Sequence, residues 1–200
     1  TKQPGAVRFL EPGAYRMMYG VARMSKNGTG ISGDNYTYSG SLPGQVIMSL
    51  SDGMGSGAAA DQESRKVIEL LQQLLETGFS ARSALKMVNT ILMLTGTEQH
   101  PATLDLCCVD LCSGVLEAMK MGAVATFVLS NGQAEILDAG NLPAGVLSQA
   151  EPALLSRKLW DNDQIIMITD GVLDACPGLD KEQSLKEYLE SMPVKTPQDM

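Results

Sequence analysis

The hydrophobic period of this chain changes from that of helices to that of strands, and this change restricts the fold more than any other feature. Apolar residues recur at helical spacing in residues 58–77 and again after Ser80, and Gly78 separates the two patterns. Strands separated by Ser-Gly and Asn-Gly turns are then expected at residues 103–112, 114–121, 126–130 and 134–138. We therefore expect a helix pair followed by an antiparallel meander.

Shorter apolar runs predict further strands and a last helix. The strands are expected at residues 15–25, 46–51 and 165–169, and the helix at residues 181–192. This order of elements indicates an α+β layered domain rather than a doubly wound sheet. With 200 residues, of which 44% are hydrophobic, the chain is large enough for one substantial core, so we expect residues 1–200 to form one domain.

Composition and charge exclude several functions. The net charge of −8 repels phosphate backbones, which excludes nucleic acid as a partner, and His100 is the only histidine, which excludes a His-rich zinc site. The cysteines at 107, 108, 112 and 176 lack C-x-x-C spacing and are predicted to be small, buried hydrophobic residues in a reducing compartment. No apolar run approaches the roughly 20 residues that cross a bilayer, and no signal-peptide pattern is present. We expect a cytoplasmic segment without membrane contact.

Two segments repeat one pattern, in which an apolar strand is followed by a hydroxyl residue and then by Asp-Gly. They end in Asp52-Gly53 and Asp170-Gly171. A strand holds such an aspartate rigidly, and the glycine allows another group, or its own carbonyl, to approach closely. If the two strands lie side by side, their carboxylates converge, and Asp34, also beside a glycine, is a third candidate. Clustered carboxylates form a hard-oxygen site suited to Mg²⁺ or Mn²⁺, which would relieve their mutual repulsion.

Structural interpretations of these residues stand beside the functional one. Asp-Gly after a strand is a common turn. The glycine-rich loop at residues 53–57 lacks the signature of a P-loop and that of a dinucleotide fold, so it is weak as a phosphate cradle. Thr103 and Asp105 are interpreted as polar residues at a strand edge or turn, and Lys120 as part of a solvated strand face.

Five motifs occur in the order found in one enzyme family. They are Gly33-Asp34-Asn35-Tyr36, Asp52-Gly53-Met54-Gly55-Ser56-Gly57, Thr103-Leu104-Asp105-Leu106, Lys120-Met121-Gly122 and Thr169-Asp170-Gly171-Val172. In this order they resemble the metal-dependent PPM (PP2C-like) serine/threonine phosphatases, and above all their sporulation members. The combination is specific, whereas any one of the motifs alone would be weak.

The resemblance implies a fold and a set of metal ligands. The family fold is a four-layer αββα sandwich, in which two antiparallel sheets are flanked by helices. Asp52 resembles the carboxylate that bridges two metal ions, Gly53 the carbonyl ligand beside it, Asp34 a ligand of the second metal and Asp170 a ligand of the first. The implied cofactors are two Mn²⁺ or Mg²⁺ ions. The implied reaction is attack on phosphoserine or phosphothreonine by a metal-held water, through which Asp52, Asp34 and Asp170 take part in catalysis.

The resemblance also implies a partner and a cellular setting. The implied substrate is a phosphorylated anti-sigma-factor antagonist, whose dephosphorylation would activate a sporulation sigma factor. The full-length family protein is expected to be anchored in the cell membrane, and a homodimer is left open.

One departure and two alternatives complete these expectations. The family carries another metal-binding aspartate near its C-terminal strand, whereas this chain ends at Met200 without it, so we expect a truncated domain of weak or no activity. The alternatives are a related bacterial stress-response phosphatase and a noncatalytic PPM-fold binding or scaffold module. The retention of Asp34, Asp52 and Asp170 argues against the noncatalytic module.

Overall fold

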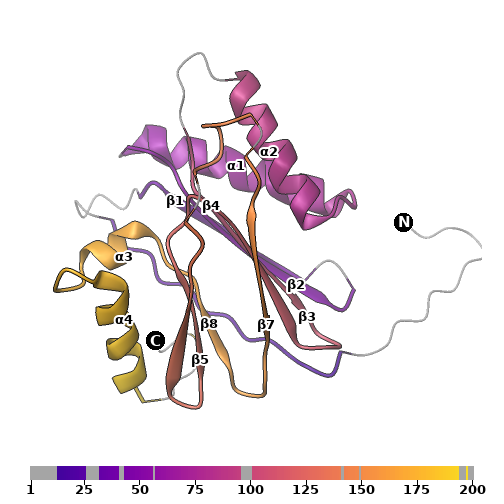
Figure 1. Ribbon diagram of the computed structural model, residues 1–200. Helices are drawn as coiled ribbons and strands as arrows, with labels where there is room; N and C mark the ends of the chain where they lie inside the picture. Colours follow the sequence, from indigo (N-terminus) through magenta and orange to yellow (C-terminus); the bar gives the residue numbers. More distant parts are fainter. Residues whose placement is uncertain are drawn as a thin grey trace, which may run out of the picture.

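Two antiparallel sheets form the centre of the computed structural model, which describes residues 13–25, 32–40, 43–55, 57–95, 101–140, 142–148, 150–193 and 197. The five-stranded sheet has the order β1-β2-β3-β4-β7. Its strands are β1 (Asp34–Ser39), β2 (Gln45–Asp52), β3 (Leu104–Asp110), β4 (Val115–Met121) and β7 (Ala153–Lys158). The three-stranded sheet has the order β6-β5-β8 and contains β5 (Thr126–Ser130), β6 (Gln133–Leu137) and β8 (Gln164–Ile166) (Figure 1).

Two helices, α1 (Ala58–Glu76) and α2 (Ala81–Thr95), cover one face of the five-stranded sheet (Figure 1). Apolar side chains at every fourth position of α1 face the sheet, as the helical spacing predicts. The buried residues of this layer are Ile47, Val67, Leu71, Leu75, Ala84, Leu85, Val88, Ala102, Leu104, Leu106, Met119, Met121 and Ala144. The helix pair is therefore held to the sheet by a continuous apolar core.

The predicted end of the first helix at Gly78 is confirmed. Gly78 has a φ of 97°, a left-handed conformation that glycine adopts without a steric penalty. Its N–H donates to the carbonyl of Leu75 at 3.0 Å, and the N–H of Phe79 donates to the carbonyl of Leu74 at 3.1 Å. This pair of hydrogen bonds is a Schellman motif, which satisfies the last carbonyls of α1 and turns the chain toward α2.

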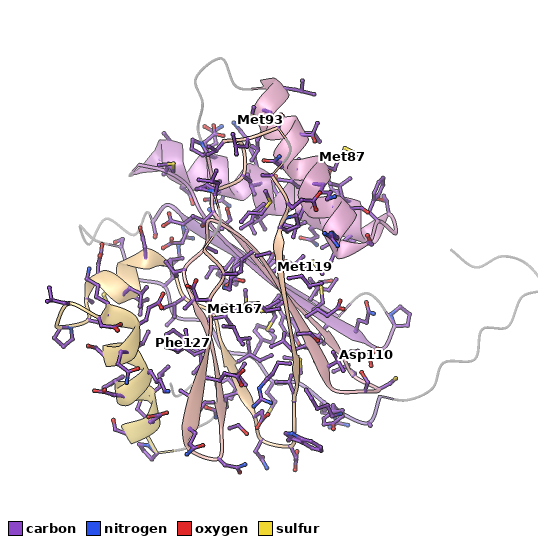
Figure 2. All side chains as sticks on the ribbon, viewed as in Figure 1. Met87, Met93, Asp110, Met119, Phe127 and Met167 are labelled. Atoms are coloured by element: carbon purple, nitrogen blue, oxygen red, sulfur yellow. The ribbon has the colours of Figure 1, made fainter. Side chains whose placement is uncertain are left out.

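The other face of the five-stranded sheet packs against the three-stranded sheet. Side chains of β3 and β4, among them Cys107 and Leu116, meet Val128 and Leu137 of the smaller sheet in a second apolar cluster. The helices α3 (Asp170–Asp174) and α4 (Lys181–Ser191) pack on the smaller sheet, where Leu185 and Leu189 contact the cluster around Phe127 (Figure 2). The inner faces of the two sheets are therefore buried against each other, and helices cover the outer face of each sheet.

The predicted strand at residues 15–25 is wrong, because this segment is extended but pairs with no sheet. Tyr15 donates its N–H to the carbonyl of Leu111, and the ring of Tyr19 stacks on Tyr38 with centroids 3.9 Å apart. Arg23 forms an ion pair with Asp61 at 3.0 Å. The aromatic and charged side chains thus fix the segment to the surface, although its composition resembles that of a strand.

The predicted continuous meander is also wrong, because β4 and β5 lie in different sheets. The chain leaves the larger sheet at Gly122, whose φ is 65° and where a Cβ would lie 2.6 Å from Pro143. The neighbour of β4 is instead β7, a strand that the sequence analysis did not predict, nor did it predict β1. Strand β8 ends at Ile166, so the predicted strand at residues 165–169 is too long.

Three further expectations concern single residues and the membrane. Cys107 is buried as predicted, but Cys112 is exposed because it lies in the turn after β3, and all four cysteines are free. His100 lies outside the described residues. Among the helices that the structure describes, none combines the length and the apolar composition that a membrane span needs.

Candidate metal centre

Asp34 and Asp52 lie directly opposite each other on neighbouring strands. Strand β1 begins with Asp34 and β2 ends with Asp52, and the antiparallel register pairs these two residues. Residues paired in this way present their side chains on the same face of a sheet. The hydroxyl of Ser32 donates to Asp34 Oδ2 at 2.7 Å, which orients that carboxylate. The pairing of two strands that follow one another in the chain therefore brings two of the three predicted carboxylates together.

Asp170 reaches the same place from the other sheet. It begins α3, four residues after the end of β8, and it lines a cavity of about 160 Å³ together with Asp52. The two strands do not lie side by side, because β2 belongs to the five-stranded sheet and β8 to the three-stranded one. The carboxylates meet instead across the layer between the sheets, where the side chain of Asp170 hydrogen-bonds with Asp52.

The electrostatics of this cluster favour a bound cation. Burial is the largest cause that raises the pKa of Asp52 to about 7, and the negative charge of Asp34 and the contacts with Asp170 raise it further. The described residues that line the cavity include Asp52, Asp105 and Asp170 but no lysine or arginine. Asp105 is paired with Lys120, which does not line the cavity, whereas Asp52 and Asp170 meet no basic side chain in the lining, so this part of the cavity attracts cations and repels anions.

Gly33 packs closely against two oxygen atoms of the site. A Cβ at this residue would lie 3.1 Å from Ala60 Cβ, 3.3 Å from the carbonyl oxygen of Gly53 and 3.4 Å from Asp52 Oδ1, so glycine is the residue that fits beside both oxygens. In the described part of the chain, no three His, Cys, Asp or Glu side chains are grouped closely enough to hold a metal ion as they stand. The donor chemistry, which is carboxylate and carbonyl oxygen without sulfur or imidazole, nevertheless fits Mg²⁺ or Mn²⁺.

The backbone of Asp52 is fixed by Thr103, which the sequence analysis interpreted as an edge or turn residue. The N–H of Asp52 donates to Thr103 Oγ1 at 2.9 Å, and the N–H of Thr103 donates to the carbonyl of Asp52 at 3.0 Å. Gly53 continues this pairing through a bridge to Ala102. Thr103 therefore lies in the wall of the cavity and positions the central carboxylate.

The interpretation of Lys120 as a solvated residue is wrong. Lys120 is 0% exposed and Asp105 is 1% exposed, and their side chains form an ion pair at 2.7 Å. Burial raises the pKa of the Asp105 carboxyl, and the ammonium of Lys120 and the hydroxyl of Thr126 oppose this shift. The sequence held one signal for the pair, since each charge is flanked by apolar residues on both sides: Leu104 and Leu106 around Asp105, and Met119 and Met121 around Lys120.

Comparison with known proteins identifies the family. Residues 43–200 match the family model described as "Stage II sporulation protein E (SpoIIE)". The chain belongs to the stage II sporulation protein E family. It is 31% identical over 195 residues to stage II sporulation protein E of Bacillus subtilis, a match that covers 97% of this chain and 24% of that protein. The chain thus spans about a quarter of the length of this relative.

Solved structures show the same architecture. The PP2C phosphatase domain of SpoIIE from Bacillus subtilis, solved with a fragment of its regulatory domain, matches with a TM-score of 0.87 and 31% identity, over 94% of this chain and 55% of that one. RsbX, solved in complex with magnesium, shares the fold with a TM-score of 0.63 and 16% identity, over 88% of this chain and 86% of that one. The predicted resemblance to sporulation phosphatases of the PP2C type is confirmed, as is an α+β fold with two antiparallel sheets and helices.

Proposed function

We propose that this SpoIIE-family chain is a phosphoprotein phosphatase domain with the four-layer αββα arrangement of the PP2C-like enzymes. It removes phosphate from phosphoserine or phosphothreonine and uses Mn²⁺ or Mg²⁺ as cofactor. The observation that carries this proposal is the approach of Asp34 and Asp170 to Asp52, beside a cavity in which the described lining residues include no lysine or arginine. Membership of the family supports it.

Each site residue has a defined task in this proposal. Asp52, whose pKa both other carboxylates raise, would be a ligand of both cations, while Asp34 would hold one of them and Asp170 the other. The carbonyl of Gly53, which lies close to Gly33, would be a further ligand. Bound divalent cations supply an activated water as the nucleophile and neutralise charge on the phosphoryl oxygens. The chain itself has to hold the carboxylates in place, and Thr103 does this for Asp52.

The substrate proposed here is a phosphorylated anti-sigma-factor antagonist, and the product would activate a sporulation sigma factor. Similarity to stage II sporulation protein E of Bacillus subtilis supports this choice. The domain is proposed to act in the cytoplasm as part of a membrane-anchored protein, with neither nucleic acid nor lipid as its partner. The net charge of −8 agrees with the absence of a polyanionic partner.

Release of phosphate from such a phosphoprotein, measured with and without Mn²⁺, tests the proposal. Asp52→Asn should abolish Mn²⁺-dependent release while circular dichroism shows an intact fold, because the variant loses the carboxylate that both cations share. Asp161→Asn is the matched control, since Asp161 is exposed in the turn between β7 and β8 and should retain wild-type turnover. Normal turnover in folded Asp52→Asn would exclude this assignment. Binding of the phosphoprotein without turnover would support the noncatalytic scaffold instead.

A further inference from the structure

A buried polar cluster adjoins the candidate metal centre. Lys120 Nζ donates to Asp105 Oδ2 at 2.7 Å, to Thr126 Oγ1 at 2.7 Å and to the carbonyl of Val124 at 2.8 Å. The hydroxyl of Thr126 donates to the same Asp105 oxygen at 2.6 Å. All three side chains are 1% exposed or less. One oxygen of Asp105 is thus held by two donors.

The other oxygen of this carboxylate is free. Asp105 Oδ1 is buried and has no hydrogen-bond partner of normal geometry among the described residues, although the backbone N–H of Leu106 stabilises the carboxylate weakly. Asp105 lines the same cavity as Asp52 and Asp170. Buried carboxylate oxygens are nearly always satisfied, so a free one beside a cavity indicates a partner that binds there.

The cluster also holds one wall of the cavity. Asp105 and Lys120 belong to the larger sheet, Thr126 begins β5 of the smaller sheet, and Val124 lies in the crossing between them. Gly122, Ala123 and Val124 of this crossing line the cavity. A buried ion pair of this kind contributes little net stability relative to apolar side chains of similar size. Its position at the cavity wall therefore gives a better reason for its presence than the stability of the fold.

The register of the sheet places Asp105 at a suitable distance from Asp52. Asp105 pairs with Leu50, which is two residues before Asp52 and on the same face of β2. Such diagonal neighbours are about 7–8 Å apart. Cα atoms at about this separation allow the two carboxylates to approach one bound water from either side.

We propose that Asp105, held by Lys120 and Thr126, is a positioning residue of the candidate metal centre, whose free Oδ1 accepts a hydrogen bond from a water retained by a divalent cation at Asp52 and Asp170. The inference rests on the proposed metal centre. Lys120 serves to keep Asp105 ionised and oriented, since it donates to Oδ2 and leaves Oδ1 without a hydrogen-bond donor among the described side chains. Residues that hydrogen-bond to the ligands of a metal, and not to the metal itself, typically change metal affinity by about 10–100-fold when they are removed.

Calorimetric titration with Mn²⁺, with thermal unfolding measured on the same variants without metal, tests this role. In Asp105→Asn the amide oxygen can still accept from Lys120 and Thr126, which leaves the NH₂ group in the place of Oδ1. We expect a loss of Mn²⁺ affinity of about tenfold or more, because a donor replaces the acceptor. Asp161→Asn makes the same change at an exposed aspartate outside the cluster, so its affinity should remain within about threefold of wild type.

A double variant covers the case in which Asp105→Asn does not fold. Asp105→Leu with Lys120→Met removes both charges together, so no unpaired charge stays buried, and it should lose Mn²⁺ affinity to the same extent. Wild-type affinity in whichever of these two variants folds would overturn the proposal, even if their stability falls.

A result that refutes the proposed metal centre can be told apart from one that refutes only the role of Asp105. If the wild-type chain binds Mn²⁺ and Asp52→Asn does not, the metal centre stands and the Asp105 variants decide the further inference alone. A wild-type chain that binds no Mn²⁺ would overturn both.

Discussion

Gly53→Ala is the substitution for which the structure makes the sharpest prediction. Gly53 lies between Asp52 and the loop that leads into α1, and its N–H donates to the carbonyl of Gly33 at 3.2 Å. A Cβ at this position would be 2.9 Å from the carbonyl carbon of Ala60 and 3.1 Å from its Cα, and it would collide with the carbonyl oxygen. Since these are backbone atoms of α1, no side-chain rotation can relieve the contact.

The size of the effect follows from this overlap. Carbon atoms in contact are normally about 3.5–4.0 Å apart, so α1 or the strand must move by roughly 0.6–1.1 Å. Overpacking of this kind costs about 1–3 kcal/mol. For a chain of this length a loss of about 2 kcal/mol lowers Tm by about 4–8 °C. The same shift displaces the Gly53 carbonyl and Asp52, so Mn²⁺ affinity should fall as well.

Thermal unfolding and Mn²⁺ calorimetry measure the two effects, and Gly140→Ala is the matched control. A Cβ at Gly140 meets no atom within 4 Å, so this variant should keep Tm within about 2 °C. It should also keep its Mn²⁺ affinity. If Gly53→Ala matched Gly140→Ala in both measurements, the tight contact between Gly53 and α1 would not matter in solution, and the reasoning would fail.

Two further predictions concern the elements around this contact. Hydrogen bonds from Asn35, Arg65 and Arg23 lower the pKa of Asp61 to about 2, below its ordinary value of 3.8, so its stabilising effect is present above pH 4 and lost as the pH falls toward 2. The stability difference between wild type and Asp61→Asn in urea should therefore be smaller at pH 3 than at pH 6, and equal differences would contradict this. Val88→Ala, in the fully buried core of α2, should lower the free energy of unfolding by about 2 kcal/mol and also weaken Mn²⁺ binding, because α2 packs on the helix that contacts Gly53. A change in stability alone would show that the helix pair only packs.

Local patterns were sufficient to predict the helices and most strands. The apolar spacing of α1 and α2 gives their bounds to within a few residues, because a helix with one buried stripe must repeat at this period. Gly78 could be read as a helix end because only a residue that tolerates a positive φ fits there. These features depend on residues close together in the chain.

The pairing of strands in the folded chain could not be predicted from local patterns in this way. Strand β1 alternates weakly and β7 carries charged residues, and both are edge strands, so neither shows the apolar run that marks a central strand. The separation of β4 from β5 depends on the packing of Gly122 against Pro143, which is about twenty residues away. No short-range pattern carries that information.

In the candidate site, too, the local features could be predicted from the sequence and the tertiary contacts could not. Asp52 and Asp170 could be chosen from their position after apolar runs, and Asp34 from its position beside a glycine, whereas the roles assigned to them remain predictions. Asp105 and Lys120 were misread because a charged residue in a strand is usually at an edge or in solvent. Only the register between β3 and β4 shows that the two charges face each other in the interior.

The acidic groups of the site come from two different sheets, and this arrangement would link cation binding to the stability of the fold. Asp34 and Asp52 belong to the five-stranded sheet, whereas Asp170 follows the last strand of the three-stranded one. A cation held by Asp52 and Asp170 together would bind only while the sheets are packed together, so its binding energy would add to the cohesion of the two halves of the fold. At one hundred times its dissociation constant, such a ligand stabilises the native state by about 2.7 kcal/mol. The concentration of divalent cations would then set how often the two sheets separate.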